Sequence, residues 1–485
     1  MERIRPGRAW PLFDMAASRA IEQHAAAPLP PHTLMQRAGL AVARLALALA
    51  PHAKTIWIAC GPGNNGGDGF EAATHLRAWG KNPVITWSGD PGRAPPDALA
   101  SLRRARAAGV PFAARPPATW ELAIDAMLGL GAGRPLEDEL AAWAGAMNEG
   151  AQPVLAVDLP SGLAADTGAG QPLRASHTLC LLTLKPGLFT GGGRDAAGQV
   201  WFDDLGVAAP ADPTAWLAGP PPDAARRHAS HKGSYGDVVV VGGACGMGGA
   251  ALLAADAALH GGAGRVFVAL LDPAAPPFDA SQPAFMLRDW RSLDLSRMSV
   301  ACGCGGGEAV REALPAVIAQ ARALVLDADA LNAIAVDAQL QSLLAARGRR
   351  ARPTVLTPHP LEAARLLGCG AGDVQADRLA ASRQLAQRFG AVVVLKGSGT
   401  VTAAPDRAPL VNPTGNARLA TAGTGDVLAG LMAARLAGAG SAFDAAAAAV
   451  YLHGLAAQSW PAGQPLTAAQ LARATQFAPA AAPAL

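Results

Sequence analysis

The sequence predicts an α/β protein of two consecutive domains, each with a largely parallel sheet covered by helices on both faces. In both halves, short apolar and β-branched segments alternate with segments of helical periodicity, and strands separated by helices pair in parallel. Between the halves, residues 207–227 are rich in proline and lack periodicity, as expected of a linker. A length of 485 residues suits two or three domains. We therefore predict domains at 1–209 and 223–485, joined by a linker at 210–222.

The individual elements follow from apolar runs and from helical periodicity. In the first half the expected strands are Thr55–Cys60, Pro83–Trp87, Leu122–Leu128, Val154–Leu159 and Thr178–Leu184, and the expected helices are Phe70–Gly80 and Asp97–Ala108. In the second half the expected strands are Asp237–Val241, Arg265–Leu271, Ala323–Asp327, Pro353–Thr357, Ala391–Lys396 and Val401–Ala404, the last paired as a short hairpin. The expected helices of that half are Gly249–His260, Asp426–Leu436 and Phe443–Ser459.

Composition and charge exclude several function classes. A net charge of +3 with 16% charged residues gives no sign of nucleic acid or of an anionic membrane as partner. The six cysteines are scattered through apolar runs, which is typical of a reducing compartment. Cys302 and Cys304 have no second Cys/His pair, so we interpret them as packing residues rather than metal ligands. With no signal peptide and no transmembrane run, we expect a soluble cytoplasmic protein.

Three polar segments of the first half follow expected strands, where ligands collect in open α/β sheets. They are Gly61–Gly69 (Gly-Pro-Gly-Asn-Asn-Gly-Gly-Asp-Gly), Gly129–Arg134 and Asp158–Gly162. A glycine-rich loop that opens a helix binds anions, and Arg134 suits a phosphate. The alternative is that each segment is a tight turn whose glycines only permit a positive φ.

Oxygen-bearing side chains at these strand ends also predict a cation site. Asn65, Asp125 and Ser161 come from three different strand ends and offer hard oxygen ligands. The loops around them lack the several carboxylates of a tight divalent site, so a monovalent ion such as K⁺ is favoured.

These residues resemble the N-terminal domain of NAD(P)HX epimerases through segments 61–69, 125–136, 157–163 and 184–188. The resemblance implies a Rossmann-like three-layer fold, a bound K⁺ and interconversion of the two C6-hydroxyl epimers of hydrated NADH and NADPH. The implied K⁺ ligands are Asn65, Asp125 and Ser161. The implied substrate contacts are Asn64, Asn65, Gly66, Gly67, Asp68, Gly129, Leu130, Gly131, Ala132, Gly133, Arg134, Pro135 and Asp158. We expect Asp158 to be the acid/base, because loss and return of a hydroxyl needs a proton donor.

In the second half, a similar set of loops follows the expected strands. Gly423–Gly425 opens a helix and forms an anion hole, with Asp426 beside it as a base for phosphoryl transfer to a hydroxyl. Lys396–Thr400 is a platform for nucleotide phosphates. Alternatives stay open: Asp426 as a helix cap, His359 as a structural residue, and Asp327 with Asp329 as a metal pair or as a cap and a core carboxylate.

This half resembles the ADP- or ATP-dependent NAD(P)HX dehydratase domain, whose fold is ribokinase-like. The matching segments are 232–236, 327–332, 357–368, 394–400 and 415–430. The resemblance implies dinucleotide contacts from Ala250, Gly305, His359 and Asp426, and nucleotide contacts from Lys396, Gly397, Ser398, Gly399, Thr400 and Gly425. It also implies Mg²⁺ with ADP or ATP as phosphoryl donor. Two departures are Ala417-Arg418, where Pro-Gly is frequent, and Gly303–Gly307 (Gly-Cys-Gly-Gly-Gly), where Gly-Pro-Gly-Leu-Gly is usual.

Together the resemblances predict a bifunctional enzyme that repairs hydrated NADH and NADPH. The dehydratase half would phosphorylate the C6 hydroxyl, because phosphate is a better leaving group than hydroxide, and the epimerase half would supply the required S epimer. We expect a homo-oligomer without nucleic-acid or membrane partners. The alternative is a ribokinase-like small-alcohol kinase fused to a non-catalytic ligand-binding module.

Overall fold

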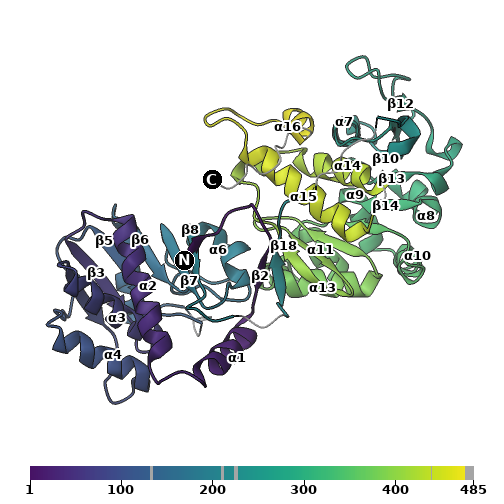
Figure 1. Ribbon diagram of the computed structural model, residues 1–485. Coiled ribbons are helices and arrows are strands. Elements are labelled where there is room, and N and C mark those ends of the chain that lie inside the picture. The colour runs from purple at the N-terminus through teal and green to yellow at the C-terminus, as the bar shows by residue number, and fades with distance from the viewer. Residues whose placement is uncertain (131–134, 209–211, 223–227, 439, 476–485) are drawn as a thin grey trace. The chain divides into compact units, whose positions relative to one another are not determined.

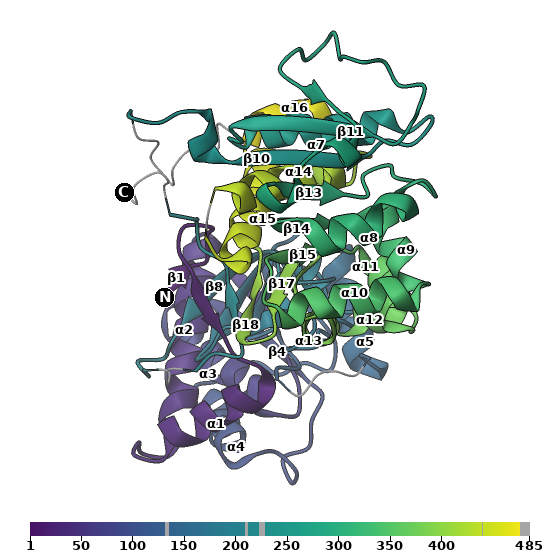
Figure 2. The same ribbon diagram turned by 90° about the vertical axis from the view of Figure 1, so that its right-hand side faces the viewer.

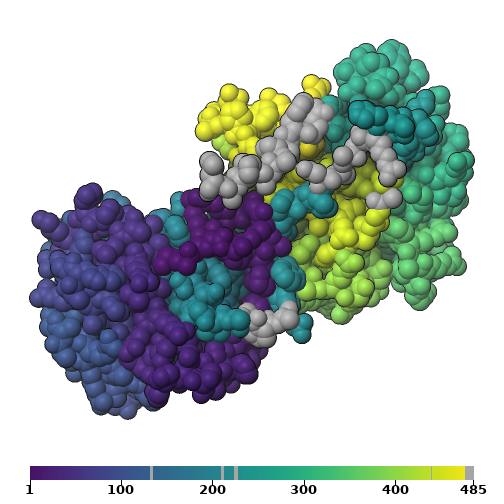
Figure 3. Space-filling view, in the orientation of Figure 1, coloured from purple at the N-terminus to yellow at the C-terminus, as the bar shows by residue number. Residues whose placement is uncertain are grey.

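The computed structural model describes residues 1–130, 135–208, 212–222, 228–438 and 440–475 (Figures 1–3). The chain divides into two compact units, Met1–Arg5 with Trp10–Trp216, and Pro6–Ala9 with Leu217–Leu485. Each unit has a largely parallel sheet with helices, so the predicted α/β class is confirmed. The division after Trp216 falls inside the segment expected as a linker, of which residues 210 and 211 lie outside the described part. Among the described residues, no helix combines the length and apolarity that a bilayer crossing requires.

The sheet of the first unit has the order β1-β8-β7-β6-β5-β3-β4, parallel except for β1 (Figure 1). The strands are β1 (Glu2–Arg3), β3 (Thr55–Cys60), β4 (Asn82–Trp87), β5 (Leu122–Ala126), β6 (Val154–Val157), β7 (His177–Leu181) and β8 (Gln199–Asp203). From β3 the chain moves first to β4 on one side and then to β5 on the other. Such a reversal opens a crevice at the carboxyl ends of the strands, where ligands bind.

Helices cover both faces of this sheet, as a three-layer fold requires. The helices of the unit are α1 (Met15–Ala26), α2 (Thr33–Leu49), α3 (Asn64–Ala78), α4 (Pro96–Ala107), α5 (Asp138–Glu149) and α6 (Gly193–Ala196). Helices α2, α3 and α4 share one apolar cluster with one face, and α5 packs Trp143 and Met147 against Trp57 on the other. Two short elements complete the unit, β2 (Trp10–Leu12) and the 3-10 turn η1 (Pro186–Phe189).

Helix α3 corrects the sequence-based prediction, because it begins at Asn64 and not at Phe70. Its glycines are therefore helical residues that allow close packing. A Cβ added at Gly66 would lie 2.1 Å from the Gly61 carbonyl oxygen, and one at Gly69 would lie 2.7 Å from Cys60 Sγ. Helix propensity disfavours glycine, and tertiary packing overrides that preference here.

Strands β6 and β7 end earlier than the apolar runs predicted. The residue after each strand, Asp158 or Leu182, has a positive φ, of 66° and 64° respectively. A positive φ turns the backbone away from the extended conformation and is uncommon for residues with a side chain. The strained backbone conformation of Asp158 therefore occurs at the point where the chain leaves the sheet.

The second unit has the strand order β12-β11-β10-β13-β14-β15-β16-β17-β18, parallel from β12 to β16. These strands are β10 (Asp237–Gly242), β11 (Arg265–Leu270), β12 (Met286–Leu287), β13 (Ser299–Cys302), β14 (Ala323–Leu326), β15 (Thr354–Leu356), β16 (Val392–Leu395), β17 (Val401–Ala404) and β18 (Arg407–Val411). Strand β17 pairs antiparallel with both β16 and β18, which confirms the hairpin at Val401–Ala404. A further short strand is β9 (Ala215–Leu217).

Helices again cover both faces of this second sheet (Figure 2). They are α7 (Gly248–His260), α8 (Val310–Gln320), α9 (Ala328–Ala335), α10 (Ala338–Arg349), α11 (Pro360–Leu367), α12 (Ala371–Ala376), α13 (Arg378–Phe389), α14 (Thr424–Ala437), α15 (Ala442–Gln458) and α16 (Ala468–Ala474). Helices α7, α14 and α15 share one apolar cluster with the sheet. Alanine and glycine bring α7 and α14 very close, since a Cβ added at Gly430 would lie 1.8 Å from the Ala254 carbonyl oxygen.

Candidate active sites

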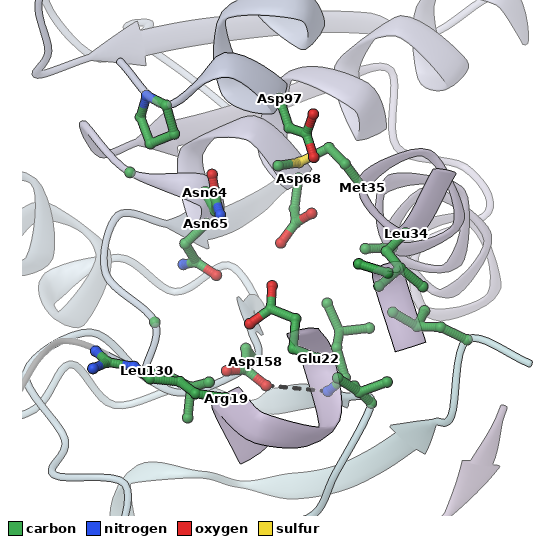
Figure 4. A pocket seen from close by; sticks show the side chains of 18 of the residues that line it. Arg19, Glu22, Leu34, Met35, Asn64, Asn65, Asp68, Asp97, Leu130 and Asp158 are labelled. Carbon is green, nitrogen blue, oxygen red and sulfur yellow. Dashed lines mark hydrogen bonds between the residues drawn. The ribbon is translucent and has the colours of Figure 1, made fainter. Parts of the chain in front are cut away.

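A cavity of about 510 Å³ in the first unit gathers most of the described residues predicted to bind substrate (Figure 4). It lies where β3, β5 and β6 end, and helix α1 contributes to its wall. Its polar and charged lining residues are Ser18, Arg19, Glu22, His32, Thr33, Asn64, Asn65, Asp68, Asp97, Asp158, Thr183 and Lys185. Gly129 and Leu130 also line it. Gly131, Ala132, Gly133 and Arg134 lie outside the described residues.

Asp158, the predicted acid/base, is held by a buried lysine. Lys185 Nζ donates hydrogen bonds to Asp158 Oδ1 and, at 2.9 Å, to the Leu181 carbonyl oxygen. The side chains of both partners are almost inaccessible to water. Burial opposes the charge of Lys185, but the Asp158 carboxylate and the Cys180 side chain together outweigh this effect, and the pKa of Lys185 is raised. The pair therefore places on the cavity wall a carboxylate whose negative charge is balanced by the lysine.

Two further carboxyls converge on Asp158 in this cavity. Figure 4 shows the side chains of Glu22 and Asp68 pointing into the same space as Asp158. Burial raises the pKa of Glu22 and raises that of Asp68 more strongly, and the charge of Asp158 adds to both shifts. Sequence analysis identified Asp68 through its glycine loop. It missed Glu22, which lies in a helix without a motif.

The three predicted cation ligands are only partly brought together. Ser161 donates to Asp125 through Oγ at 2.6 Å and through its backbone N–H at 2.8 Å, and both residues are fully buried. Burial raises the pKa of Asp125 to about 6, against the opposing effect of these hydrogen bonds. Asn65 lies beside Gly129 on the cavity wall, and its buried Nδ2 has no hydrogen-bond partner among the described residues.

In the second unit, Asp426 stands in the first turn of α14 beside two buried side chains. One ligand atom each of Cys304, Asp327 and Asp426 lies within 4.8 Å of the others. Burial raises the pKa of Asp426 to about 6, the charge of Asp327 adds to the shift, and the Cys304 thiol opposes it. None of the described hydrogen bonds joins the Asp426 carboxylate to a backbone N–H of the helix start. The alternative of a helix cap therefore gains no support from these contacts.

Lys396 links the predicted nucleotide platform to this cluster. Its Nζ donates to Asp327 Oδ1 at 2.6 Å and lies 3.9 Å from Glu362 Oε2. A Cβ added at Gly425 would lie 3.6 Å from the same nitrogen, so Lys396 reaches the loop that opens α14. Because Lys396 is paired with Asp327, the cluster includes one positively charged side chain.

The remaining predicted residues of the second unit have separate partners. Asp329 accepts from the Gly307 backbone N–H at 2.9 Å, whereas Asp327 pairs with Lys396. His359 caps α11 through Nδ1, which accepts hydrogen bonds from the backbone N–H groups of Leu361 at 3.1 Å and Glu362 at 3.2 Å. Burial lowers the pKa of His359 and favours its neutral form. The capping contact is the structural role that the sequence left open.

Ala250 and Gly305, two predicted dinucleotide contacts, lie next to each other. A Cβ added at Gly305, where φ is +58°, would lie 2.9 Å from Ala250 Cβ. Cys302 and Cys304 are buried as predicted, but the Cys304 thiol also bonds Asp426. Sequence analysis missed His453 of α15, whose Nε2 lies 2.9 Å from the Thr424 carbonyl oxygen. Burial lowers the pKa of His453 to about 4, so a neutral imidazole supports the start of α14.

Comparisons with known proteins match both halves of the chain. The family model described as NAD(P)H-hydrate dehydratase matches residues 238–477, and the one described as YjeF-related protein N-terminus matches residues 31–187. The bifunctional NAD(P)H-hydrate repair enzyme Nnr of Escherichia coli (strain K12) is 36% identical over 453 residues, covering 88% of this chain and 84% of that protein.

Two further matches cover the second unit. The ADP-dependent (S)-NAD(P)H-hydrate dehydratase of Neisseria meningitidis serogroup B is 46% identical over 240 residues, covering 48% of this chain and 80% of that protein. A solved ADP/ATP-dependent NAD(P)H-hydrate dehydratase from Bacillus subtilis aligns with a TM-score of 0.43 and 30% identity, covering 52% of this chain and 92% of that one. From the matches that span both units, this chain belongs to the family of bifunctional NAD(P)H-hydrate repair enzymes.

Proposed function

We propose that the first unit interconverts the C6 epimers of hydrated NADH and NADPH, and that the second unit uses ADP or ATP to return the S epimer to the reduced cofactor. The observation that carries this proposal is an ion pair between a lysine and an aspartate in each unit, next to a second carboxyl with a raised pKa. Family membership supports both steps, and the Neisseria relative supports ADP as donor.

In the first unit, the cavity would hold the hydrated nicotinamide ring beside Asp158. The start of α3, with Asn64 and Asn65, would bind a phosphate of the dinucleotide, because free N–H groups and the helix dipole favour an anion there. Lys185 keeps Asp158 in place and compensates its charge. Asp158 takes part in the proton transfers that accompany loss and return of the C6 hydroxyl.

The residues Asn65, Asp125 and Ser161 fit a K⁺ ion in their chemistry, since the side chain of each offers an oxygen ligand. A bound K⁺ would offset the charge of Asp125 and hold the start of α3 against the loop at Gly129. These residues position the phosphate site and take no part in proton transfer.

In the second unit, Asp426 would take the proton of the C6 hydroxyl as that oxygen attacks the terminal phosphate of the nucleotide. A pKa of about 6 suits a base at neutral pH. The backbone N–H groups of Gly425 and its neighbours, with Lys396, would hold the transferred phosphate. The nucleotide enters as its Mg²⁺ complex. Phosphate then leaves C6 more readily than hydroxide, a proton is lost from C5 to solvent, and the C5=C6 double bond of the reduced nicotinamide ring is restored.

The test is recovery of reduced nicotinamide from a mixture of both epimers of hydrated NADH. Full-length protein with ADP or ATP should restore the near-ultraviolet absorbance of NADH completely, because the first unit feeds the second. Without nucleotide, the epimer ratio should relax and no absorbance should return. Absence of recovery with any adenine nucleotide, together with phosphorylation of a small alcohol, would instead favour the kinase alternative.

A further inference from the structure

Helix α1 brings an unassigned carboxyl, Glu22, into the cavity of the first unit. Asp14 caps the helix start, and the backbone N–H of Met15 donates to Asp166 Oδ1 at 2.7 Å. Ser18 Oγ bonds Thr183 Oγ1 at 2.7 Å. Residues four apart share a helix face, so the contact of Ser18 directs Glu22 toward the same wall. Glu22 also lies before residues 31–187, the segment that the family model matches.

The surroundings of Glu22 differ from those of Asp158, although the two carboxyls share the cavity (Figure 4). Lys185 bonds Asp158, whereas no described hydrogen bond or ion pair involves Glu22. Burial raises the pKa of Glu22, and the nearby charge of Asp158 raises it further. The other charged groups that act on it are Lys185, Arg19, Asp97 and Asp68.

Two carboxyls whose environments favour different protonation states are suited to opposite roles in proton transfer. The carboxylate that accepts a hydrogen bond from a lysine is placed to accept a proton. Burial favours the protonated form of the carboxyl without a cationic partner, which is placed to donate a proton.

We propose that Glu22 is a catalytic residue of epimerisation, which protonates the departing C6 hydroxyl while Asp158 accepts the proton of the water that returns. This inference rests on the proposed function of the first unit. It assigns the acid to helix α1 and the base to the end of β6.

The step balances as follows. The C6–O bond breaks, the lone pair of the ring nitrogen N1 forms a C6=N1 double bond, and the Glu22 proton leaves with the oxygen as water. A water molecule then adds to the other face of C6, the electron pair returns to N1, and the released proton goes to Asp158. The proton returns from Asp158 to Glu22 through water.

The decisive variant is Glu22→Gln in the full-length chain, with the surface change Glu149→Gln as a charge-matched control. Epimerisation is followed without nucleotide by chromatography of the two epimers. Glu22→Gln should lower kcat by about 10²-fold or more with little change in KM, because it removes the acid and leaves the phosphate site. Glu22→Asp should retain part of the rate, and Glu149→Gln all of it.

Two controls separate catalysis from positioning and from misfolding. Wild-type kcat/KM should fall at high pH as Glu22 loses its proton, and Glu22→Gln should lack that decline. Asp68→Asn, in the segment that binds phosphate, should raise KM instead. ADP-dependent dehydration of the S epimer should be unchanged in every variant.

A Glu22→Gln protein that epimerises within a few-fold of wild type, or that keeps the high-pH decline, would overturn this inference alone. A wild-type chain that dehydrates the S epimer but never interconverts the two would overturn the proposed function of the first unit together with it.

Discussion

The two sites of this enzyme share one arrangement of charges and differ in where the working carboxyl stands. Each has a lysine bonded to an aspartate at a strand end, and each has a second carboxyl whose pKa is raised by burial and by that aspartate. The lysine pairs are Lys185 with Asp158 and Lys396 with Asp327, and the second carboxyls are Glu22 and Asp426.

The difference lies in the secondary structure that carries the second carboxyl. Asp426 stands in the first turn of α14, where the helix dipole favours its charged form and suits a base. Glu22 stands in the second half of α1, where no helix end offsets burial, and suits an acid. The same arrangement of charges thus suits a base when the second carboxyl lies in the first turn of a helix, and an acid when it lies in the second half of a helix.

The largest expected effect tests the base of the second unit. Asp426→Asn should lower dehydration by roughly 10²–10⁴-fold, because the C6 hydroxyl loses its proton acceptor. ADP binding, measured by calorimetry, should survive because Lys396–Thr400 remain. In wild type, kcat/KM for dehydration should fall as pH drops through about 6, where Asp426 becomes protonated. Turnover of Asp426→Asn near the wild-type rate would return this residue to a capping role.

The next effect concerns the buried pair of the first unit. Lys185→Met should leave Asp158 buried without a cation and destabilise this unit by about 3–5 kcal/mol, measured by urea unfolding. Lys54→Met, at an exposed site, is the control and should have little effect. Equal stabilities for the two variants would show that the lysine does not compensate Asp158.

A smaller effect tests the K⁺ proposal. Asp125→Ala should weaken substrate binding and epimerisation by roughly tenfold, as loss of a supporting ligand commonly does, while dehydration is unchanged. Replacing K⁺ in the buffer by a bulky organic cation should slow wild-type epimerisation to a similar degree. The same replacement should have no further effect on Asp125→Ala. A wild-type rate that does not respond to K⁺ would refute the ion assignment.

The smallest effect tests the separation of the units. Fragments 1–209 and 223–485 should fold separately, and the second should dehydrate only the S epimer. Leu217 is almost fully buried, and the backbone N–H of Ala218 bonds the Val411 carbonyl oxygen at 2.9 Å. A fragment that begins at residue 217 should therefore be about 2 kcal/mol more stable than 223–485. If 223–485 is insoluble unless expressed together with 1–209, the boundary cuts a shared core.

The fold class and the family were predictable because they depend on local signals. Apolar runs marked most strands of both sheets, although not β8 or β13, and glycine loops followed several of them. The comparisons confirm the predicted family and its bifunctional repair activity. Glu22 was not predictable, since it reaches the cavity through the contact of Ser18 with Thr183, residues 165 positions apart in the chain. The sequence identified Lys185 only as part of a motif. Its pairing with Asp158 was not predictable, because the two residues follow different strands.

The thiol beside Asp426 has a consequence for an enzyme that serves a redox cofactor. Burial, with the charges of Asp327 and Asp426, raises the pKa of Cys304 well above its usual range. Oxidants and alkylating agents react with thiolates, so this thiol should stay inert while the exposed Cys245 and Cys369 react first. Cofactor repair would then continue under the oxidative stress that inactivates many enzymes with accessible active-site cysteines.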